Sequence, residues 1–309
     1  MRLHRVAPFL FLATAACVAV PPELPEPDQN PAPTPAAMPS PTPTSTIEPP
    51  PNPGIPLPMP AAQLEGRFEQ GGWIRGTVPS GTESMTVDGE TLGFDPDTGE
   101  FFIGLDRDAE PTISLVFRGS NTGRLQDIEI AARNWDIERV NVPLRPSGTS
   151  EEWWQRREPE WLAIKAAREQ ETGAQGWRQS FVWPVTGRIS GRFGRQRIYQ
   201  GEPGSYHSGL DIAPGNGVPF VSPADGVVVL ARTGFSLEGG IVIVDHGAGL
   251  NSAFIHLSRL AVSEGDAIRQ GQVLGNVGSS GRATGPHLHW SLVWQDKRLD
   301  PLLFLPPMP

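Results

Sequence analysis

The chain of 309 residues is poor in the residue types that form covalent cross-links or strongly basic surfaces. It has one cysteine and two tyrosines, and its only lysines are Lys165 and Lys297. A single cysteine cannot close an internal disulfide or build a cysteine-rich metal cluster, so any metal must be bound by His, Asp or Glu. The formal charge is −9, and ten Lys or Arg stand against nine Asp or Glu from Phe181 onward, without a basic cluster. We therefore expect no nucleic-acid partner.

The N-terminal segment has an apolar run that is too short to span a bilayer. Residues 1–19 begin with two arginines, continue with this run and end in small residues, which is the layout of an export signal. The residues before Cys17 resemble a bacterial lipoprotein box, with Thr14 where a Leu is usual. Two outcomes stay open: lipidation of Cys17 with membrane anchoring, and cleavage near Ala19. Both predict an exported protein of the periplasm or cell envelope.

Proline and glycine are abundant and divide the chain. From Pro21 to Pro60, 17 of 40 residues are proline, which leaves too little apolar surface for a core, so residues 20–62 are predicted to form a disordered linker. Residues 63–146 alternate short apolar runs with turn residues. This alternation predicts a small β-sandwich-like module that serves as a spacer or binding module.

Residues 147–175 are predicted to form a helical linker. Ser150 is the expected N-cap, and Pro159 is expected to begin a second helical segment. Three tryptophans of this linker are expected to be packing residues: Trp153, Trp154 and Trp161.

Short β-branched runs broken by glycine fill residues 176–309 and predict an antiparallel β-sheet domain. The fold class expected for the whole chain is mainly β. Five of the six histidines lie between His207 and His289. In an extended segment, residues two or four positions apart share a face. His207 and Asp211 could therefore converge on one ion, and His287 and His289 should point to the same side of a strand.

His256 lies on a predicted strand where it shares a side with Phe254 and Ser258. His246 falls at a predicted hairpin turn and is expected to be structural. Residues 193–206, rich in Arg and Gly, are expected to form a loop along one wall of a groove.

Several motifs in register resemble one known family. His207-x-x-x-Asp211, Phe254-x-His256-Leu-Ser and Gly285-Pro-His287-Leu-His289 occur in this order, and the similarity runs from about Trp183 to Leu305. They resemble the LytM and lysostaphin-type peptidoglycan zinc endopeptidases, whose catalytic domain is of a hybrid-barrel type. One departure is Phe254, where the family often has Tyr.

The resemblance implies one Zn²⁺ bound by His207, Asp211 and His289, with His256 and His287 as the catalytic pair. Two imidazoles and one carboxylate leave a fourth position for water, as a catalytic zinc site requires. Zinc lowers the pKa of its bound water to about 7. The implied substrate is peptidoglycan stem peptides. Family members cut either glycine bridges or bonds between D-alanine and a diamino acid, and the anchored layout with a proline-rich tether favours the latter. Further partners would be other cell-wall or division proteins.

Two other functions compete with an active endopeptidase. The first is a non-catalytic LytM-type regulator that binds and activates other wall hydrolases, although here all five chemical positions are filled. The second is a lipoyl or biotinyl carrier, because the motifs around Asp225 and Glu264 also resemble that barrel. A carrier needs an attachment lysine on a hairpin, and neither Lys165 nor Lys297 suits that role.

Overall fold

A computed structural model of the chain describes residues 57–144 and 150–309. The predicted export signal, Cys17 and most of the Pro-rich linker lie outside these ranges and stay predictions. The described chain is mostly β with one α-helix, α1 (Glu151–Arg168), which confirms the mainly β fold class. All described residues belong to one compact unit, so the module boundaries within it stay a proposal. Within these ranges no helix has the length and apolar character needed to cross a membrane.

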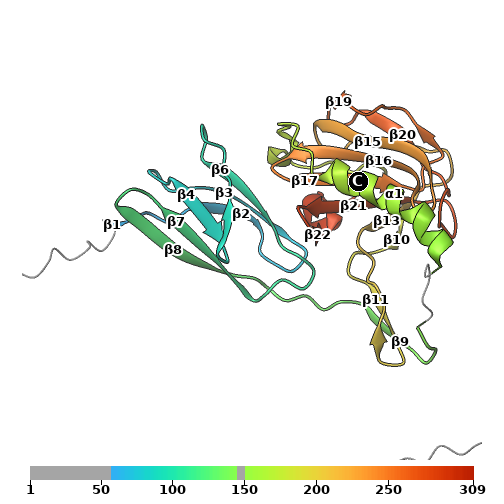
Figure 1. The fold of residues 1–309 in the computed structure, drawn as a ribbon, viewed down its shortest axis with the longest axis horizontal. Helices are drawn as coiled ribbons and strands as arrows, with labels where there is room; N and C mark the ends of the chain where they lie inside the picture. The colour runs from blue at the N-terminus through green and yellow to red at the C-terminus, as the bar shows by residue number, and fades with distance from the viewer. Residues whose placement is uncertain (1–56, 145–149) are drawn as a thin grey trace, which may run out of the picture. The chain divides into compact units, whose positions relative to one another are not determined.

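Two sheets of the N-terminal part pack against each other (Figure 1). Phe117 of one sheet and Phe101 of the other are both buried, with ring centroids 6.3 Å apart. One sheet has the order β1-β8-β7-β4-β5 and the other β2-β3-β6. Their strands are β1 (Leu57–Pro58), β2 (Gln63–Arg67), β3 (Trp73–Thr77), β4 (Ser84–Val87), β5 (Glu90–Leu92), β6 (Glu100–Gly104), β7 (Thr112–Arg118) and β8 (Thr122–Glu129).

The C-terminal part is built on one large sheet of order β10-β13-β21-β17-β16-β15-β19, with β22 paired to β21. All neighbouring strands are antiparallel, which confirms the predicted antiparallel sheet. The strands are β10 (Arg188–Gly191), β13 (Leu210–Ala213), β15 (Gly226–Phe235), β16 (Gly239–Gly247), β17 (Leu250–Ile255), β19 (Ala267–Ile268), β21 (Leu288–Trp294) and β22 (Lys297–Leu299). A smaller antiparallel sheet joins β14 (Pro219–Val221), β20 (Val273–Asn276) and β18 (Arg259–Leu260).

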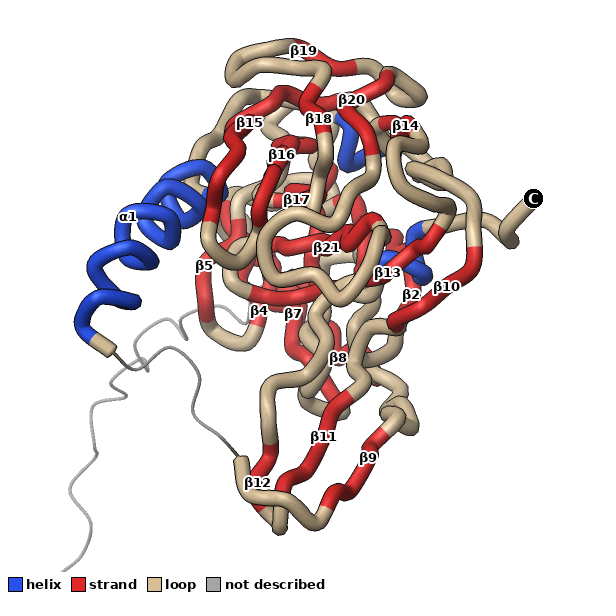
Figure 2. Tube along the Cα trace, turned by 90° about the vertical axis from the view of Figure 1, so that its right-hand side faces the viewer, coloured by secondary structure: helices blue, strands red, loops and turns tan. Residues whose placement is uncertain are grey.

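Strand β16 is buried along its whole length because both of its faces are covered. Val242 and Val244 enter the main hydrophobic core, whereas Ile241 and Ile243 enter a second cluster together with Ile164 of α1. This split follows from the alternation of side chains along a strand. Helix α1 therefore lies against one face of the sheet, beside β15 and β16 (Figures 1 and 2).

Helix α1 is continuous from Glu151 to Arg168, so the predicted break at Pro159 is wrong. Ser150 is the N-cap as expected, and its hydroxyl oxygen accepts from the Trp153 backbone N–H. A proline inside a helix removes one backbone hydrogen bond. Tertiary contacts hold the helix on both sides of this position. Before it, the Arg157 guanidinium donates twice to Glu238, at 2.7 and 2.8 Å. After it, Glu160 accepts from the backbone N–H and the hydroxyl of Ser236.

The tryptophans of α1 do not all pack into the core. Trp154 is 51% exposed and Trp161 is 50% exposed, so the packing role expected for these two is wrong. Trp153 is half-buried and contacts Trp154 edge to face, with ring centroids 4.8 Å apart. The helix turns Ile164 and Ala167 toward the sheet instead.

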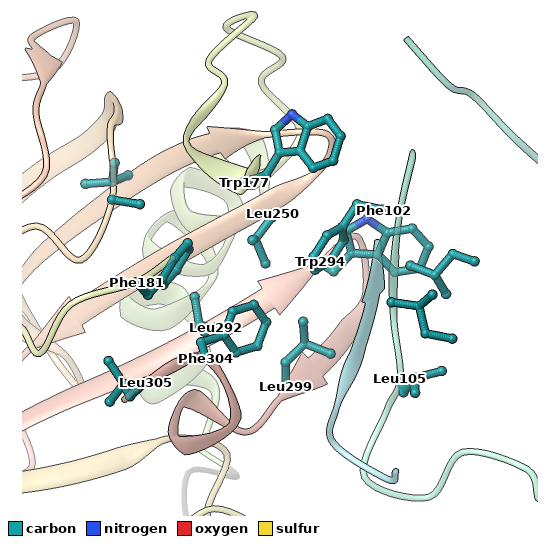
Figure 3. Close-up of a cluster of buried hydrophobic side chains, with 14 of the residues drawn as sticks. Phe102, Leu105, Trp177, Phe181, Leu250, Leu292, Trp294, Leu299, Phe304 and Leu305 are labelled. Atoms are coloured by element: carbon teal, nitrogen blue, oxygen red, sulfur yellow. The ribbon is translucent and has the colours of Figure 1, made fainter. Parts of the chain in front are cut away.

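Aromatic side chains from distant parts of the sequence meet in the main core (Figure 3). Phe102 of β6 lies 6.2 Å from Trp294 of β21 and 6.3 Å from Trp177, measured between ring centroids. Trp177 belongs to the 3-10 helix η1 (Gly176–Arg178), and Phe304 ends the 3-10 helix η2 (Pro301–Phe304). These contacts join the N-terminal strands to the large C-terminal sheet.

The segment 193–206 is not a simple loop as predicted. It contains the strand β11 (Gln196–Tyr199), which pairs antiparallel with β12 (Glu202–Pro203) and parallel with β9 (Ile137–Val140). The partner β9 lies about 60 residues earlier in the chain, so local sequence could not reveal the pairing.

Candidate metal centre

Three polar side chains converge where β13 meets β21. Asp211 of β13 lies directly opposite His289 of β21 in the antiparallel register, and His207 precedes β13 by three residues. Residues opposite each other in an antiparallel pair point to the same face. The strand register therefore places the carboxylate beside the imidazole, and the short turn through Gly209 brings His207 to them.

The potential ligand atoms lie close together. Asp211 Oδ1 is 2.8 Å from His289 Nδ1 and 3.1 Å from His207 Nε2, and the two imidazole nitrogens are 3.2 Å apart. Among the described residues, these three form the group of His, Cys, Asp or Glu side chains whose ligand atoms all lie within 4.8 Å of one another. The set contains two nitrogen donors and one oxygen donor.

A backbone carbonyl orients the His207 imidazole of this cluster. His207 Nδ1 donates to the Arg192 carbonyl oxygen at 2.9 Å, which leaves the lone pair of Nε2 facing Asp211. Such an outer hydrogen bond fixes the tautomer and the ring orientation of a metal ligand. The position of the Nδ1 proton follows from this pairing.

Two glycines leave room for the cluster. A Cβ atom at Gly191 would lie 2.3 Å from Asp211 Oδ2, and one at Gly209 would lie 2.6 Å from His289 Nε2. Real Cβ atoms do not approach so closely, so any side chain at either position would displace a ligand candidate. These glycines are site residues that the sequence analysis did not single out, although both lie within the range of family similarity from about Trp183 to Leu305.

His256 and His287 lie beside the cluster. Their ring centroids are 4.9 Å apart, and His287 Nε2 is 3.7 Å from Asp211 Oδ1. Each ring is oriented by a backbone carbonyl: His256 Nδ1 donates to Ser280 O at 2.9 Å, and His287 Nδ1 donates to Gly285 O at 2.8 Å. These contacts engage Nδ1 of each ring and leave Nε2 available for a substrate or water.

His256 has a φ of 67°, in the left-handed region that non-glycine residues rarely adopt. Its backbone N–H donates to the Glu238 carbonyl at 2.8 Å, and its side chain is held by Ser280. Such strain is of order 1–3 kcal/mol and persists only where the surroundings impose it, which is frequent at functional sites. Residues 238 and 280 are thus positioning elements that the sequence did not reveal.

The electrostatics of the cluster follow from burial and from one carboxylate. Burial opposes charge on Asp211, but its hydrogen bonds with His207 and His289 outweigh that effect and hold its pKa well below the usual value. Burial alone would lower the pKa of His207, and the hydrogen bond to Asp211 raises it overall. Burial lowers the pKa of His289 and of His256. The site therefore combines an ionised carboxylate with two imidazoles that favour the neutral form, those of His289 and His256, and one that favours the protonated form, that of His207.

Three further side chains, of His246, Phe254 and Tyr206, have their contacts outside the cluster. His246 is fully buried within β16, consistent with the structural role expected for it, although it lies in a strand. Phe254 is buried in the main core beside Trp290, on the sheet face opposite to the site, so its missing hydroxyl does not affect the cluster. The Tyr206 hydroxyl donates to Asp106, and burial together with that carboxylate raises the pKa of Tyr206 to about 12.

Comparison with known proteins places the site in a family context. The model of peptidase family M23 matches residues 205–301, a range that contains all five histidine and aspartate candidates. The chain is 36% identical to the peptidoglycan DD-endopeptidase ShyA of Vibrio cholerae over 107 residues, which are 34% of this chain and 25% of that protein. It is also 36% identical to the lipoprotein NlpD/LppB homolog of Pseudomonas aeruginosa over 131 residues, 42% of this chain and 40% of that protein.

A crystal structure of a peptidase M23 from Pseudomonas aeruginosa extends the likeness beyond the sheet. It matches with a TM-score of 0.58 and 28% identity, covering 77% of this chain and 94% of that one. The curated relatives are matched only over a quarter to two fifths of their length. The shared part includes the cluster of His207, Asp211 and His289, and the chain therefore carries a peptidase family M23 domain.

Proposed function

We propose that this protein is a zinc-dependent endopeptidase that hydrolyses the peptide cross-links of bacterial peptidoglycan in cell-wall remodelling. The strongest support is the convergence of His207 Nε2, Asp211 Oδ1 and His289 Nδ1 beside two further imidazoles. Two imidazoles and one carboxylate are a donor set used by catalytic zinc sites, which keep one position for water or substrate. A purely structural zinc site would have four protein ligands.

The side chains fit such an ion. Asp211 carries the negative charge that offsets a divalent cation, and His207 presents Nε2 because its Nδ1 is engaged by Arg192 O. Gly191 and Gly209 provide the space that a side chain would fill. When bound here, zinc would polarise the scissile carbonyl and make water more acidic.

His256 and His287 are the groups that would hold and transfer protons. Each has Nδ1 bonded to a backbone carbonyl and Nε2 directed away from it. One of them would accept a proton from the attacking water and deliver it to the leaving amine. The other, with a proton on Nε2, would donate a hydrogen bond from that nitrogen to the carbonyl oxygen as it gains negative charge.

The bond that we propose is the D-alanyl–diamino acid bond of the cross-link. The relative named peptidoglycan DD-endopeptidase, 36% identical over 107 residues, supports this choice. The location that follows is the periplasm or cell envelope of a bacterium, with stem peptides as the substrate. Anchoring through Cys17 and contacts with other cell-wall or division proteins are part of the same proposal.

The alternative is a non-catalytic regulator of wall hydrolases. The relative of Pseudomonas aeruginosa named a lipoprotein NlpD/LppB homolog matches as well as the endopeptidase does, so similarity alone does not decide between the two. The retention of all five chemical side chains favours hydrolysis.

Zinc content and hydrolysis distinguish these functions. We expect the full chain to bind about one zinc after reconstitution and to release soluble amines from peptidoglycan. His289→Ala should lose both zinc and activity, whereas His287→Ala should keep zinc and lose activity. Equal zinc content in the two variants would contradict the division into ligands and catalytic pair, and a zinc-loaded wild type without hydrolysis would favour the regulator.

A further inference from the structure

A large cavity opens beside the metal centre, on the sheet face that α1 covers. Its volume is about 1210 Å³, and its lining includes His289, Ser208 and part of α1. The same lining contains two arginines that come from different elements, Arg168 at the end of α1 and Arg298 in β22. Neither was singled out by sequence analysis.

Arg168 is a partly buried cation whose Nε has no acceptor among the described residues. Its Nε atom is inaccessible to solvent and has no hydrogen-bond partner in the part of the chain that the structure describes. Burial and then the charge of Arg298 lower the pKa of Arg168 to about 10, and Glu238 opposes this effect. Glu238 is itself bound by both nitrogens of Arg157, which neutralises it. A buried unpaired charge is costly unless a ligand completes it.

Arg298 adds a second positive charge to the same wall. Its Nη1 donates to Ser208 Oγ at 3.1 Å, a neutral acceptor directly after His207 in sequence. This contact joins the wall of the cavity to the metal centre. Arg168 and Arg298 place two positive charges on this wall, and the Arg298 charge acts with burial to lower the pKa of Arg168.

Among the described residues, no carboxylate of the cavity lining forms an ion pair with Arg168 or Arg298. Asp245 accepts from Thr172 and Gly247, and Glu169 pairs with Lys165. The other acidic residues of the lining either pair with arginines or lie exposed at the rim: Asp95 and Glu100 bond to Arg178, Glu238 to Arg157, and Glu171 and Asp296 are exposed. Arg168 and Arg298 can therefore donate hydrogen bonds to an anion that enters the cavity.

We propose that Arg168 and Arg298 form a binding site for a free carboxylate of the peptide substrate. This inference rests on the proposed function and names the class of substrate. Guanidinium groups bind carboxylates through paired, charge-assisted hydrogen bonds. In a cross-link between D-alanine and a diamino dicarboxylic acid, the carbon bonded to the scissile nitrogen carries a free carboxylate. A glycine bridge has no carboxylate at that position.

The helix holds Arg168 in place firmly enough to serve this role. Ile164 and Ala167, one turn and one residue before it, are buried against the sheet. Glu160 accepts from the backbone N–H and the hydroxyl of Ser236 at the turn between β15 and β16. A pre-positioned guanidinium loses little freedom when a ligand binds, which increases its contribution to affinity.

Binding can be tested without hydrolysis. Calorimetry of the full chain in EDTA would measure the affinity for a cross-linked muropeptide dimer in three forms: with free carboxylates, with the carboxylate next to the scissile nitrogen amidated, and with the D-glutamate carboxylate amidated. We expect one of the two amidated forms to bind more weakly than the free form, on the order of ten- to a hundredfold, as the loss of a charged hydrogen bond does. Arg168→Gln and Arg298→Gln should each abolish that preference, whereas Arg168→Lys should keep most of it.

Arg156→Gln is the matched control, because it removes the same charge from an exposed position of α1. It should leave the preference unchanged. Absence of binding, an equal affinity for all three forms, or a preference retained in both Gln variants would overturn the anion site. A retained carboxylate preference in a zinc-loaded protein that hydrolyses nothing would instead refute the proposed function and leave the anion site standing.

Discussion

The buried imidazole of His246 predicts a loss of stability in mild acid. Its Nδ1 donates to the Asp225 carbonyl at 2.7 Å, and its Nε2 accepts from the Ser252 hydroxyl at 2.8 Å. Ser252 Oγ in turn accepts from Trp290 Nε1 at 3.1 Å. A proton on Nε2 would leave the Ser252 hydroxyl facing two donors, with its own proton unpaired. Burial, the main cause, lowers the pKa of His246 from 6.5 to about 4, against the opposing effect of the Asp225 carbonyl.

The sign and size of the effect follow from linkage. Between pH 6.5 and about 4 the unfolded chain binds a proton at this residue that the folded chain does not, so the free energy of unfolding falls as the pH falls. The contribution is fully present at pH values above 6.5 and fully lost below about 4. A shift of this size corresponds to about 3 kcal/mol, of which about 2 kcal/mol should be lost between pH 7 and pH 5.

The assay compares urea unfolding of the wild type and His246→Asn, both metal-free, at several pH values from 7 to 4. The Asn amide can still donate to Asp225 but does not titrate, and all other titrating groups are common to both proteins. We expect the variant to be less stable at pH 7 and the difference to narrow by about 2 kcal/mol at pH 5. A difference that stays constant with pH would refute the proposed hydrogen-bond arrangement.

Three further predictions concern packing and backbone strain in and around the site, and each compares two variants. Gly209→Ala should weaken zinc binding at least about tenfold, because its Cβ would collide with His289 Nε2. The control Gly93→Ala, whose Cβ would meet nothing within 4 Å, should leave zinc binding unchanged. Equal zinc affinities of the two variants would contradict the close approach. The free energy of unfolding of His256→Gly should be about 1 kcal/mol higher than that of His256→Ala, because glycine relieves the positive φ. Both variants should lack hydrolysis. Equal urea midpoints of the two variants would argue against strain. Ile164→Ala should lower the free energy of unfolding by about 2–4 kcal/mol, because Ile164 is buried against the sheet. Trp161→Ala should lower it by less than about 1 kcal/mol, because Trp161 is half exposed on the same helix. The reverse order would mean that α1 is not held as described.

The parts of the site that depend on local spacing were accessible from the sequence. His287 and His289 are two positions apart around the start of β21, so strand geometry brings them to one side. His207 and Asp211 are four apart, and the turn through Gly209 brings His207 to the carboxylate. The structure places all five predicted side chains together, and their division into ligands and catalytic pair stays a prediction. The mainly β fold class was accessible for the same reason, since it follows from short β-branched runs between glycines.

Features that depend on tertiary contacts were not accessible. Pro159 indicated a helix boundary, but the contacts of Arg157 with Glu238 and of Glu160 with Ser236 hold one continuous helix across it. The exposure of Trp161 follows from which face of α1 meets the sheet, and that choice is made by Ile164 and Ala167. The pairing of β9 with β11 joins segments whose local sequences give no sign of each other.

The two arginines of the cavity show most clearly why sequence spacing reaches only part of a site. Metal ligands are recognisable because their residue types are few and their spacing reflects strand geometry. An arginine is common at helix ends and on surfaces. Arg168 becomes unusual only because its Nε is buried without a partner while Glu238, whose charge acts on it, is already bound to Arg157. The charge balance of a cavity is a property of contacts between elements 130 residues apart in sequence, as Arg168 and Arg298 are. Substrate discrimination in this domain should therefore vary with the residues that line α1 and β22, even where the metal ligands are unchanged.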